Sequence, residues 1–387
     1  MASHAPGEDR ARGAPPGWNG HATCPVGEAF WTKGSRPMRN SGGGRAAQAA
    51  APILLLAALS TSLAGCAAPS RFGRDDRDRI AGKTFVVTGA SSGLGRGAAL
   101  KLASHGANVV LAARRAEALE EAAAEARAAG GQALAVPTDV SSADQVERLA
   151  EAAVARFGRI DVWINNAAVA AIGRFEEVPL ADHARVVDVN LKGVVHGSHA
   201  ALRRFRVQGR GTLVNIASVE GRVPLAYHAS YAATKHAVLG LGAALNQEMR
   251  LGGTPAIKVS SVLPWAVDTP FWDNTANYTG GTPRMYTMDA AQEVVDAVVW
   301  ASIHPAKEYA VGWKAKGAVL GDRIWPGLAE RVAADVVHRA QIETAPPAPP
   351  TAGALHEPIR PGVTTVEGGA RARMEREDRQ RRERDGR

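Results

Sequence analysis

The sequence predicts a doubly wound α/β domain, in which helices cover both faces of a parallel sheet. Short apolar runs alternate with longer helical stretches from about residue 79 to residue 326. The runs are apolar throughout, which is typical of strands that are buried on both faces. The first run leads directly into a glycine-rich turn, as the first connection of such a sheet often does. We therefore predict a single domain over residues 80–326, with other segments on either side.

Six apolar runs are the predicted strands. In chain order they are KTFVVTG (83–89), NVVLAAR (108–114), ALAVPTD (133–139), DVWINNA (161–167), GTLVNIAS (211–218) and IKVSSVLP (257–264). The predicted helices between them include Ala116–Ala129, Ser142–Phe157, Leu180–Arg206 and Ser230–Leu251. Strands that alternate with helices in this way are expected to run parallel.

A leader occupies residues 1–79, and its first part is rich in Gly, Pro, Ala and Arg, which predicts disorder or a later start at Met38. Residues 46–66 follow a basic stretch and end in small residues before Cys66, the layout of a secretory signal. The string LAGC (63–66) resembles the lipobox of bacterial lipoproteins, in which Cys66 would carry lipid. An accidental alanine-rich string is the alternative. We expect membrane association through residues 46–66, with a cytoplasmic location as the alternative.

Composition limits the partners that the chain can have. The formal net charge is +8, but the basic residues of the tails are interleaved with acidic ones. A nucleic-acid site needs clustered basic side chains on a folded face, so we predict no nucleic-acid partner. Cys24 and Cys66 both precede the domain, which predicts no disulfide or metal site within it. Residues 327–387 are predicted to form a short helix and then a disordered Arg-rich tail.

The turn TGASSGLG (88–95) follows the first predicted strand and opens a helix. Gly89, Gly93 and Gly95 allow a sharp bend and a close approach of the backbone to an anion. The helix that follows presents free N–H groups and the positive end of its dipole. This position predicts a cradle for the phosphates of a dinucleotide, although a tight turn alone is the usual meaning of such glycines.

Four further pieces are found in the chain after this turn. They are NNAA (165–168), Asn190 in VNLKG, Ser218 at the end of VNIAS, and Tyr-x-x-x-Lys in SYAATK (230–235). Together with Thr-Gly-x-x-x-Gly-x-Gly, their order and spacing resemble the short-chain dehydrogenase/reductase family over residues 80–304. The resemblance implies a compact Rossmann-like enzyme that forms a homodimer or homotetramer.

The catalytic residues implied by the resemblance are Asn190, Ser218, Tyr231 and Lys235. Tyr231 and Lys235 are four residues apart on a predicted helix, so their side chains share one face. An adjacent ammonium is expected to lower the pKa of the tyrosine toward neutral pH, where it can act as an acid or base. Taken alone, such a pair is more often a surface pair. In the family, the serine steadies the reacting oxygen, the lysine also binds the nicotinamide ribose, and the asparagine holds a water.

The choice of cofactor depends on the residues after the second predicted strand. Ala113 occupies the position where an acid would bind the ribose of NAD, and Arg114 and Arg115 follow it. Arginine pairs with the 2′-phosphate of NADP, so NADP is favoured over NAD. The predicted cofactor-binding residues are Gly89, Ser91, Ser92, Gly93, Leu94, Gly95, Arg114, Asp139, Val140, Asn166, Ala167, Tyr231, Lys235, Val267 and Thr269.

Two positions depart from the family pattern. Ala168 replaces a glycine, and Trp265 replaces the glycine of a Pro-Gly pair, which puts in doubt the path of the loop over the nicotinamide. The long segment 269–288 is predicted to be a lid or binding loop. Its aromatic residues, with Trp265, suggest a bulky apolar substrate; they are Phe271, Trp272 and Tyr278.

The most favoured function is an oxidoreductase that moves a hydride between NADP(H) and a small-molecule carbonyl or secondary alcohol, with tyrosine as general acid or base. A non-catalytic dinucleotide sensor or interaction protein on the same fold is the alternative. An epimerase or dehydratase is disfavoured because residues 288–326 are too few for the carboxyl-terminal substrate domain of those enzymes. The sequence does not name the substrate.

Overall fold

The computed structural model describes residues 72–359, 362–384 and 386. The predictions for residues 46–66, Met38 and Cys66 therefore lie outside the described residues. In the part of the chain that is described, no helix combines the length and the apolar character that a membrane span requires.

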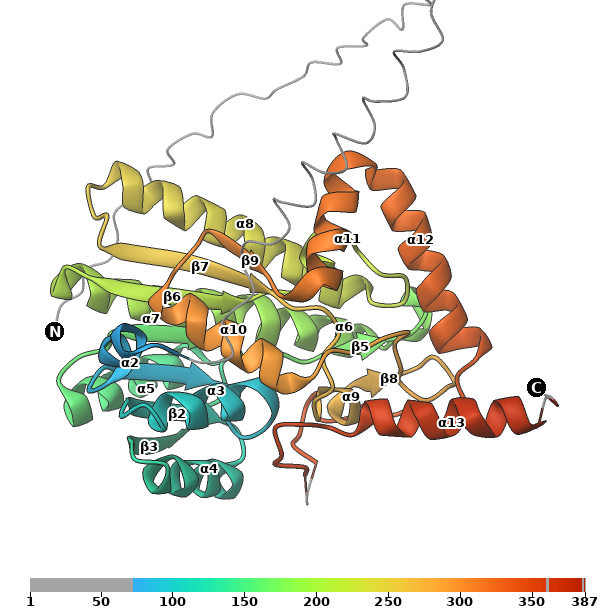
Figure 1. Ribbon diagram of the computed structural model, residues 1–387, viewed down its shortest axis with the longest axis horizontal. Helices are drawn as coiled ribbons and strands as arrows, with labels where there is room; N and C mark the ends of the chain where they lie inside the picture. Colours follow the sequence, from blue (N-terminus) through green and yellow to red (C-terminus); the bar gives the residue numbers. More distant parts are fainter. Residues whose placement is uncertain (1–71, 360–361, 385, 387) are drawn as a thin grey trace, which may run out of the picture. The chain divides into compact units, whose positions relative to one another are not determined.

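The central sheet has seven parallel strands in the order β3–β2–β1–β4–β6–β7–β9 (Figure 1). Their bounds are β1 Thr84–Thr88, β2 Asn108–Ala113, β3 Gln132–Pro137, β4 Val162–Asn165, β6 Gly211–Ile216, β7 Ile257–Leu263 and β9 Glu308–Ala310. The six predicted strands are confirmed, and β9 extends the sheet at its edge. A separate pair joins β5 (Ala171–Ile172) to β8 (Ala276–Asn277). The strand order reverses at β1, where a parallel sheet has its ligand crevice.

Helices cover both faces of the sheet, as predicted. Their bounds are α2 Arg74–Ile80, α3 Gly93–Ala103, α4 Ala116–Ala128, α5 Ala143–Phe157, α6 Leu180–Val187, α7 Gly193–Gln208, α8 Ala229–Leu251, α9 Phe271–Asn274, α10 Ala291–Ile303, α11 Gly312–Ile324, α12 Pro326–His338 and α13 Ala370–Arg384. On β1, Phe85 and Val87 pack with α3, α4 and α10, whereas Val86 packs with α5, α7 and α8. Each face of the strands is therefore buried, which explains their unbroken apolar sequence.

The single helix predicted over Leu180–Arg206 is interrupted by one π-helical turn, Asp188–Lys192. Asn190 lies in this turn and is fully buried. Its Oδ1 accepts a hydrogen bond from Val169 N, and its Nδ2 donates to Val169 O, both at 2.8 Å. These bonds satisfy a buried amide and a segment of backbone near β5, and π turns often mark such functional positions. The apolar periodicity of the sequence did not reveal the turn.

The structure after α12 differs from the predicted disordered tail. A π-helical turn, Arg339–Glu343, follows α12 directly. Further along the chain is α13, whose Ala370 and Met374 pack with Trp272 and Met285. The buried carboxylate of Asp268 accepts hydrogen bonds from the backbone N–H groups of residues 369, 370 and 371 at the start of α13. The composition of the tail could not reveal this helix, because its cap and its packing partners are distant in sequence.

Trp163 donates a hydrogen bond from Nε1 to Asn165 Oδ1 (2.7 Å), and the amide of Asn165 in turn donates to Asn215 Oδ1 (2.9 Å). All three side chains are buried. We expect Trp163→Phe to lower the free energy of unfolding by about 1–3 kcal/mol, because the buried Asn165 Oδ1 loses its donor. Urea denaturation measures this change. Trp313→Phe is the control, since Trp313 is 78% exposed; equal stability of the two variants would contradict the prediction.

Candidate active site

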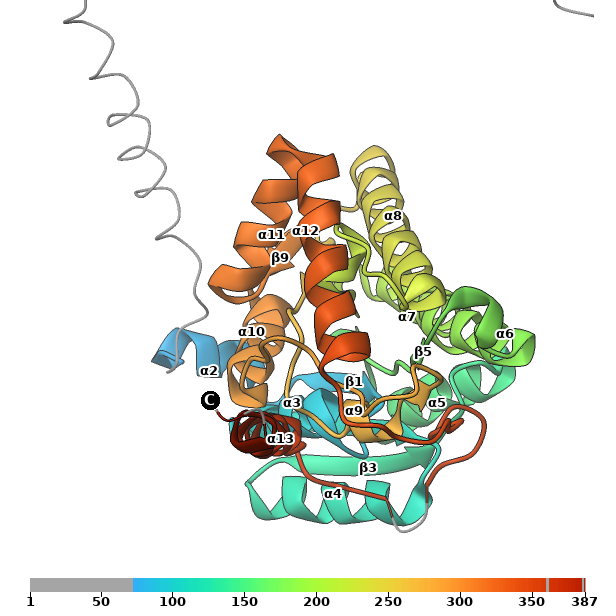
Figure 2. The ribbon, with the colours of Figure 1, turned by 90° about the vertical axis from the view of Figure 1, so that its right-hand side faces the viewer.

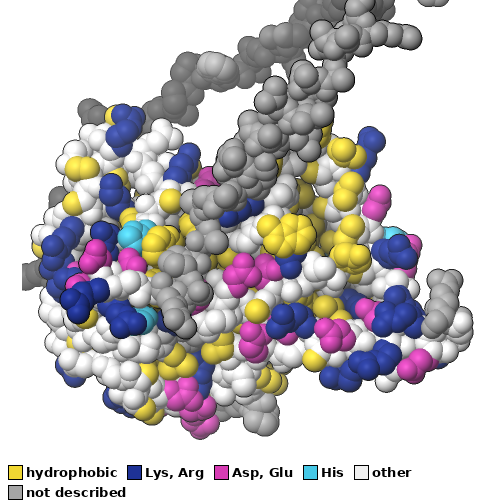
Figure 3. Space-filling view, in the orientation of Figure 1, with side chains coloured by type: hydrophobic (Ala, Val, Ile, Leu, Met, Phe, Trp, Pro, Cys, Tyr) yellow, Lys and Arg dark blue, Asp and Glu magenta, His cyan; other side chains and the backbone are white. Residues whose placement is uncertain are grey.

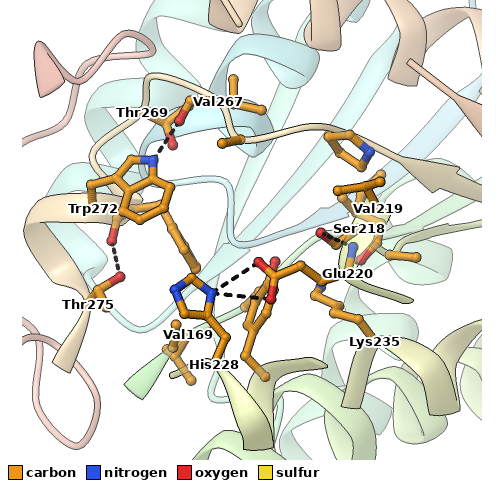
Figure 4. A pocket seen from close by; sticks show the side chains of 18 of the residues that line it. Val169, Ser218, Val219, Glu220, His228, Lys235, Val267, Thr269, Trp272 and Thr275 are labelled. Carbon is orange, nitrogen blue, oxygen red and sulfur yellow. Dashed lines mark hydrogen bonds and ion pairs between the residues drawn. The ribbon is translucent and has the colours of Figure 1, made fainter. Parts of the chain in front are cut away.

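A pocket of about 580 Å³ opens at the carboxyl ends of β1, β4 and β6. It is lined by every predicted site residue except Gly95 and Asn190. These lining residues are Gly89, Ser91, Ser92, Gly93, Leu94, Arg114, Asp139, Val140, Asn166, Ala167, Ser218, Tyr231, Lys235, Val267 and Thr269. Residues from distant parts of the sequence therefore meet in one cavity, part of which is drawn in Figure 4.

The glycine turn packs tightly against the end of β4. Gly89 has a φ of +68°, and a Cβ there would lie 2.8 Å from Ala167 Cα. A Cβ on Gly95 would lie 2.4 Å from Gly89 O. The amide of Asn166 donates to Thr88 O at 2.9 Å, which ties the ends of β1 and β4 together. The turn carries little side-chain bulk where α3 starts at Gly93, and the N–H of Gly93 donates to Thr365 O at 2.9 Å.

Charged side chains gather at the end of the pocket beyond β2. Arg114 lines the pocket, and Arg115 Nη2 donates to Ser91 Oγ at 3.2 Å. Burial lowers the pKa of Arg114, and the neighbouring Arg185 lowers it further. Asp139 forms an ion pair with Arg185 at 2.7 Å. Its carboxylate is thus already paired, and the cationic groups outnumber the anionic ones at this end.

Three of the lining side chains lie on the side of the glycine turn away from Arg114: Ser218, Tyr231 and Lys235. Ser218 follows β6, and its Oγ accepts a hydrogen bond from Glu220 N at 3.1 Å. Tyr231 and Lys235 lie on one face of α8, with Lys235 Nζ 5.4 Å from the centre of the Tyr231 ring. Lys235 Nζ donates to Ile216 O at 2.8 Å. The predicted proximity of these three residues is seen in the structure.

The direction of the pKa shift at Tyr231 is opposite to the expected one. Desolvation raises the pKa of Tyr231, the carboxylate of Glu220 raises it further, and the hydrogen bond with Ser218 offsets only part of the rise. The expectation of a lowered pKa was wrong because the sequence argument included Lys235 but not the buried Glu220. At neutral pH the phenol keeps its proton and is a weaker acid than an exposed tyrosine, so it can donate only to an oxygen that has become strongly basic.

Glu220 and His228 form a buried pair that the sequence reasoning missed. His228 Nδ1 lies 3.1 Å from Glu220 Oε1 (Figure 4), and His228 Nε2 lies 2.9 Å from Gln341 Nε2. Burial acts to lower the pKa of His228, but Glu220 outweighs it and the pKa is raised. The sequence offered two signals for this pair. Glu220 is two residues after Ser218, and His228 is three residues before Tyr231. Nothing in the sequence pointed to Gln341.

The aromatic residues of the loop have different roles. Trp265 lines the pocket and donates from Nε1 to Thr287 O at 3.0 Å, so its ring is tied to the loop. The ring of Phe271 lies 5.9 Å from that of Tyr231. Trp272 also lines the pocket, whereas Tyr278 donates to Asp182 at 2.5 Å outside it. Ala168 lines the pocket as well.

Two helices, α11 and α12, form an apolar wall of the pocket. Gly317 and Gly321 line the pocket from α11, and a Cβ at either would meet nothing within 4 Å. From α12, Leu328, Val332 and Val336 line the same space and are 59%, 54% and 37% exposed. Figure 3 shows hydrophobic side chains gathered over these two helices. The pocket is therefore apolar on the side that α11 and α12 form.

The model of the family described as short chain dehydrogenase matches residues 83–279. The chain belongs to this family. It is therefore an oxidoreductase of the short-chain dehydrogenase type, with a fold that binds a nicotinamide dinucleotide.

Individual relatives agree with this assignment. The uncharacterized oxidoreductase YxnA of Bacillus subtilis is 32% identical over 282 residues, which cover 72% of this chain and 79% of that protein. The 3beta-hydroxysteroid dehydrogenase 1 of Eggerthella lenta is 35% identical and covers 58% of this chain and 87% of its own. An alcohol dehydrogenase from the archaeon Thermococcus sibiricus, solved with 5-hydroxy-NADP, is 28% identical with a TM-score of 0.51. The similarity to that structure covers 59% of this chain and 95% of that one.

Burial lowers the pKa of Lys235 from 10.5 to about 8, although Glu220 opposes the shift. Between these two values the unfolded chain holds a proton that the folded protein has released, so the free energy of unfolding rises with pH. We expect the native protein to gain stability relative to Lys235→Met between about pH 7.5 and about pH 9.5. Urea denaturation of both proteins at both pH values measures this difference in the free energy of unfolding. A difference that does not change with pH would contradict the pKa shift.

Proposed function

We propose that the protein is an NADP(H)-dependent oxidoreductase that interconverts a bulky apolar ketone and its secondary alcohol. The observation that carries the proposal is the convergence of Ser218, Tyr231 and Lys235 beside the glycine turn in one pocket. A protein that only senses a dinucleotide needs the turn but not this acid–base group, so nothing in the pocket favours the non-catalytic alternative.

In the reductive direction, Tyr231 donates the proton and Ser218 holds the substrate. The nicotinamide supplies a hydride to the carbonyl carbon when it is bound. Tyr231 O–H gives its proton to the carbonyl oxygen, which yields the alcohol. The raised pKa of Tyr231 keeps the phenol protonated at neutral pH, so the transfer depends on the negative charge that develops on the carbonyl oxygen. The hydroxyl of Ser218 donates a hydrogen bond to the same oxygen as its negative charge develops. Oxidation of the alcohol is the reverse.

Lys235 has two roles in this proposal. Its ammonium lies beside the ring of Tyr231 and is held by Ile216 O, which fixes it between the catalytic group and the expected position of the ribose. It binds the ribose hydroxyls and stabilises the phenolate that remains after proton transfer. Asn190 does not line the pocket; its role is to fix the backbone at Val169, which does.

The preference for NADP rests on the charges beyond β2. Arg114 and Arg115 lie there, and Asp139, the carboxylate that acts on Arg114, is paired with Arg185. A 2′-phosphate would offset the excess of positive charge, whereas the neutral ribose of NAD would not. The Thermococcus sibiricus enzyme, solved with an NADP derivative, supports this choice.

The substrate class rests on the wall formed by α11 and α12. The glycines of α11 leave space, and the leucine and valines of α12 offer apolar surface to the substrate. A rigid polycyclic alcohol or ketone of steroid size fits such a wall better than a small polar one. The name of the Eggerthella lenta relative, a hydroxysteroid dehydrogenase, points to the same class.

Two other expectations stay predictions from the sequence. Attachment to a membrane through residues 46–66 and lipid on Cys66 concern residues outside the described part of the chain. A homodimer or homotetramer, implied by the family resemblance, is likewise a prediction.

The test is NADPH-dependent reduction of a panel of 3-ketosteroids by the full chain. Tyr231→Phe is expected to lower the rate at least about a hundredfold, because the proton donor is lost. NADPH affinity, from a fluorescence titration, is expected to stay the same. Tyr227→Phe is the matched control, since its hydroxyl bonds His338 Nδ1 outside the pocket. Full activity of Tyr231→Phe, or no binding of either nicotinamide nucleotide, would overturn the proposal.

A further inference from the structure

Backbone carbonyls from the segment after α12 hold the side chain of Arg114. Arg114 Nη1 donates to Leu355 O at 3.2 Å and to His356 O at 2.8 Å, and Nη2 donates to Ala354 O at 2.5 Å. We call residues 351–356 the clasp. The first clasp residue that bonds Arg114 is Ala354, which lies 240 residues after Arg114 in the sequence. Figure 2 shows the described parts of the chain between α12 and α13 on the side of the domain where α4 and β3 lie.

The clasp is itself firmly anchored. The side chain of Leu355 is fully buried in the apolar cluster beneath β5 and β8. Thr351 and Asn277 exchange backbone hydrogen bonds of 2.7 and 3.0 Å. His356 Nε2 lies 2.8 Å from Asp182 Oδ1. Because contacts on both sides fix the clasp, the position of its three carbonyls is set before any ligand binds.

Two N–H groups of the Arg114 guanidinium are not used by the clasp. It has five N–H groups, and the clasp takes three of them. The Nε–H and one N–H of Nη2 have no acceptor among the residues that the structure describes. A guanidinium can use two such donors as a fork that matches two oxygens of a phosphate. The carbonyls are neutral, so the clasp orients Arg114 without cancelling its charge.

We infer that the clasp is a positioning element that holds Arg114 ready for the 2′-phosphate of NADP(H) and so determines the preference for NADP over NAD. This inference rests on the proposed function. A free arginine side chain would lose its rotamer freedom when the phosphate binds, whereas the clasped one has lost it already. The advantage applies only to a nucleotide that carries the phosphate. The neutral 2′-hydroxyl of NAD makes no comparable bond with Arg114, so the affinity of the protein for NAD depends little on the clasp.

The test loosens the clasp without changing Arg114. Leu355→Ala removes the buried anchor. Gly353→Ala is a second, independent variant, because Gly353 has a φ of +53° and a Cβ there would lie 2.4 Å from Asn274 O. Dissociation constants of the full chain for NADPH and NADH are measured by fluorescence titration. Adenosine 2′,5′-bisphosphate and ADP serve as probes of the adenosine half alone.

We expect both variants to weaken NADPH and the bisphosphate about tenfold, while NADH and ADP change less than about twofold. Arg114→Ala alone lowers the preference for NADPH. In the Leu355→Ala background the same change has a smaller effect on that preference, because the clasp and Arg114 act through one contact. Leu149→Ala is the matched control. It also truncates a fully buried leucine, on α5 and outside the pocket, and is expected to lose stability but keep the NADPH preference.

Three results overturn the inference. A preference for NADPH that survives both clasp variants overturns it and leaves the proposed function intact. Equal weakening of NADPH and NADH also overturns it, since the clasp would then be a wall of the pocket and not a selectivity element. A native protein without any preference for NADPH overturns the proposed cofactor as well as the role of the clasp.

Discussion

The close packing of the glycine turn against the end of β4 is the constraint on which the rest of the site depends. A Cβ on Gly95 would lie 2.4 Å from the carbonyl oxygen of Gly89, and a Cβ on Gly89 would lie 2.8 Å from Ala167 Cα. The amide of Asn166 then joins the two strand ends. The Asn166 amide lies between the glycine turn and the end of β4, and a Cβ on Gly95 would lie 2.5 Å from its Nδ2. This packing places the glycine turn at the same edge of the sheet as Ser218, which follows β6.

Buried charged side chains shift the pKa values of the residues near Ser218. Glu220, His228 and Lys235 are each less than 9% exposed. The carboxylate of Glu220 acts on three neighbours: it raises the pKa of Tyr231, opposes the fall in the pKa of Lys235, and raises the pKa of His228. A tyrosine in such a setting holds its proton, so its proton transfer depends on the charges that the substrate and cofactor bring.

The chain beyond the sheet supplies the walls of the pocket. Helices α11 and α12 form the apolar side, and the clasp closes the side where Arg114 lies. Asp268, in the loop after β7, caps α13 and so ties the carboxyl-terminal helix to the sheet. The carboxyl-terminal residues therefore belong to the site in spite of a composition that is typical of disorder.

The sequence by itself determined the parallel sheet and the six main strands, because strand burial and helix spacing are local patterns. Its resemblance to the family, and not its periodicity, indicated Ser218, Tyr231 and Lys235, and a parallel sheet brings the ends of its strands to one edge. Only the tertiary structure decided the direction of the pKa shift at Tyr231, the π turn at Asn190 and the hold of the clasp on Arg114. Each of these three features depends either on burial or on a contact with a residue far away in the sequence. Neither burial of a single group nor such a contact leaves a periodic signal in the chain.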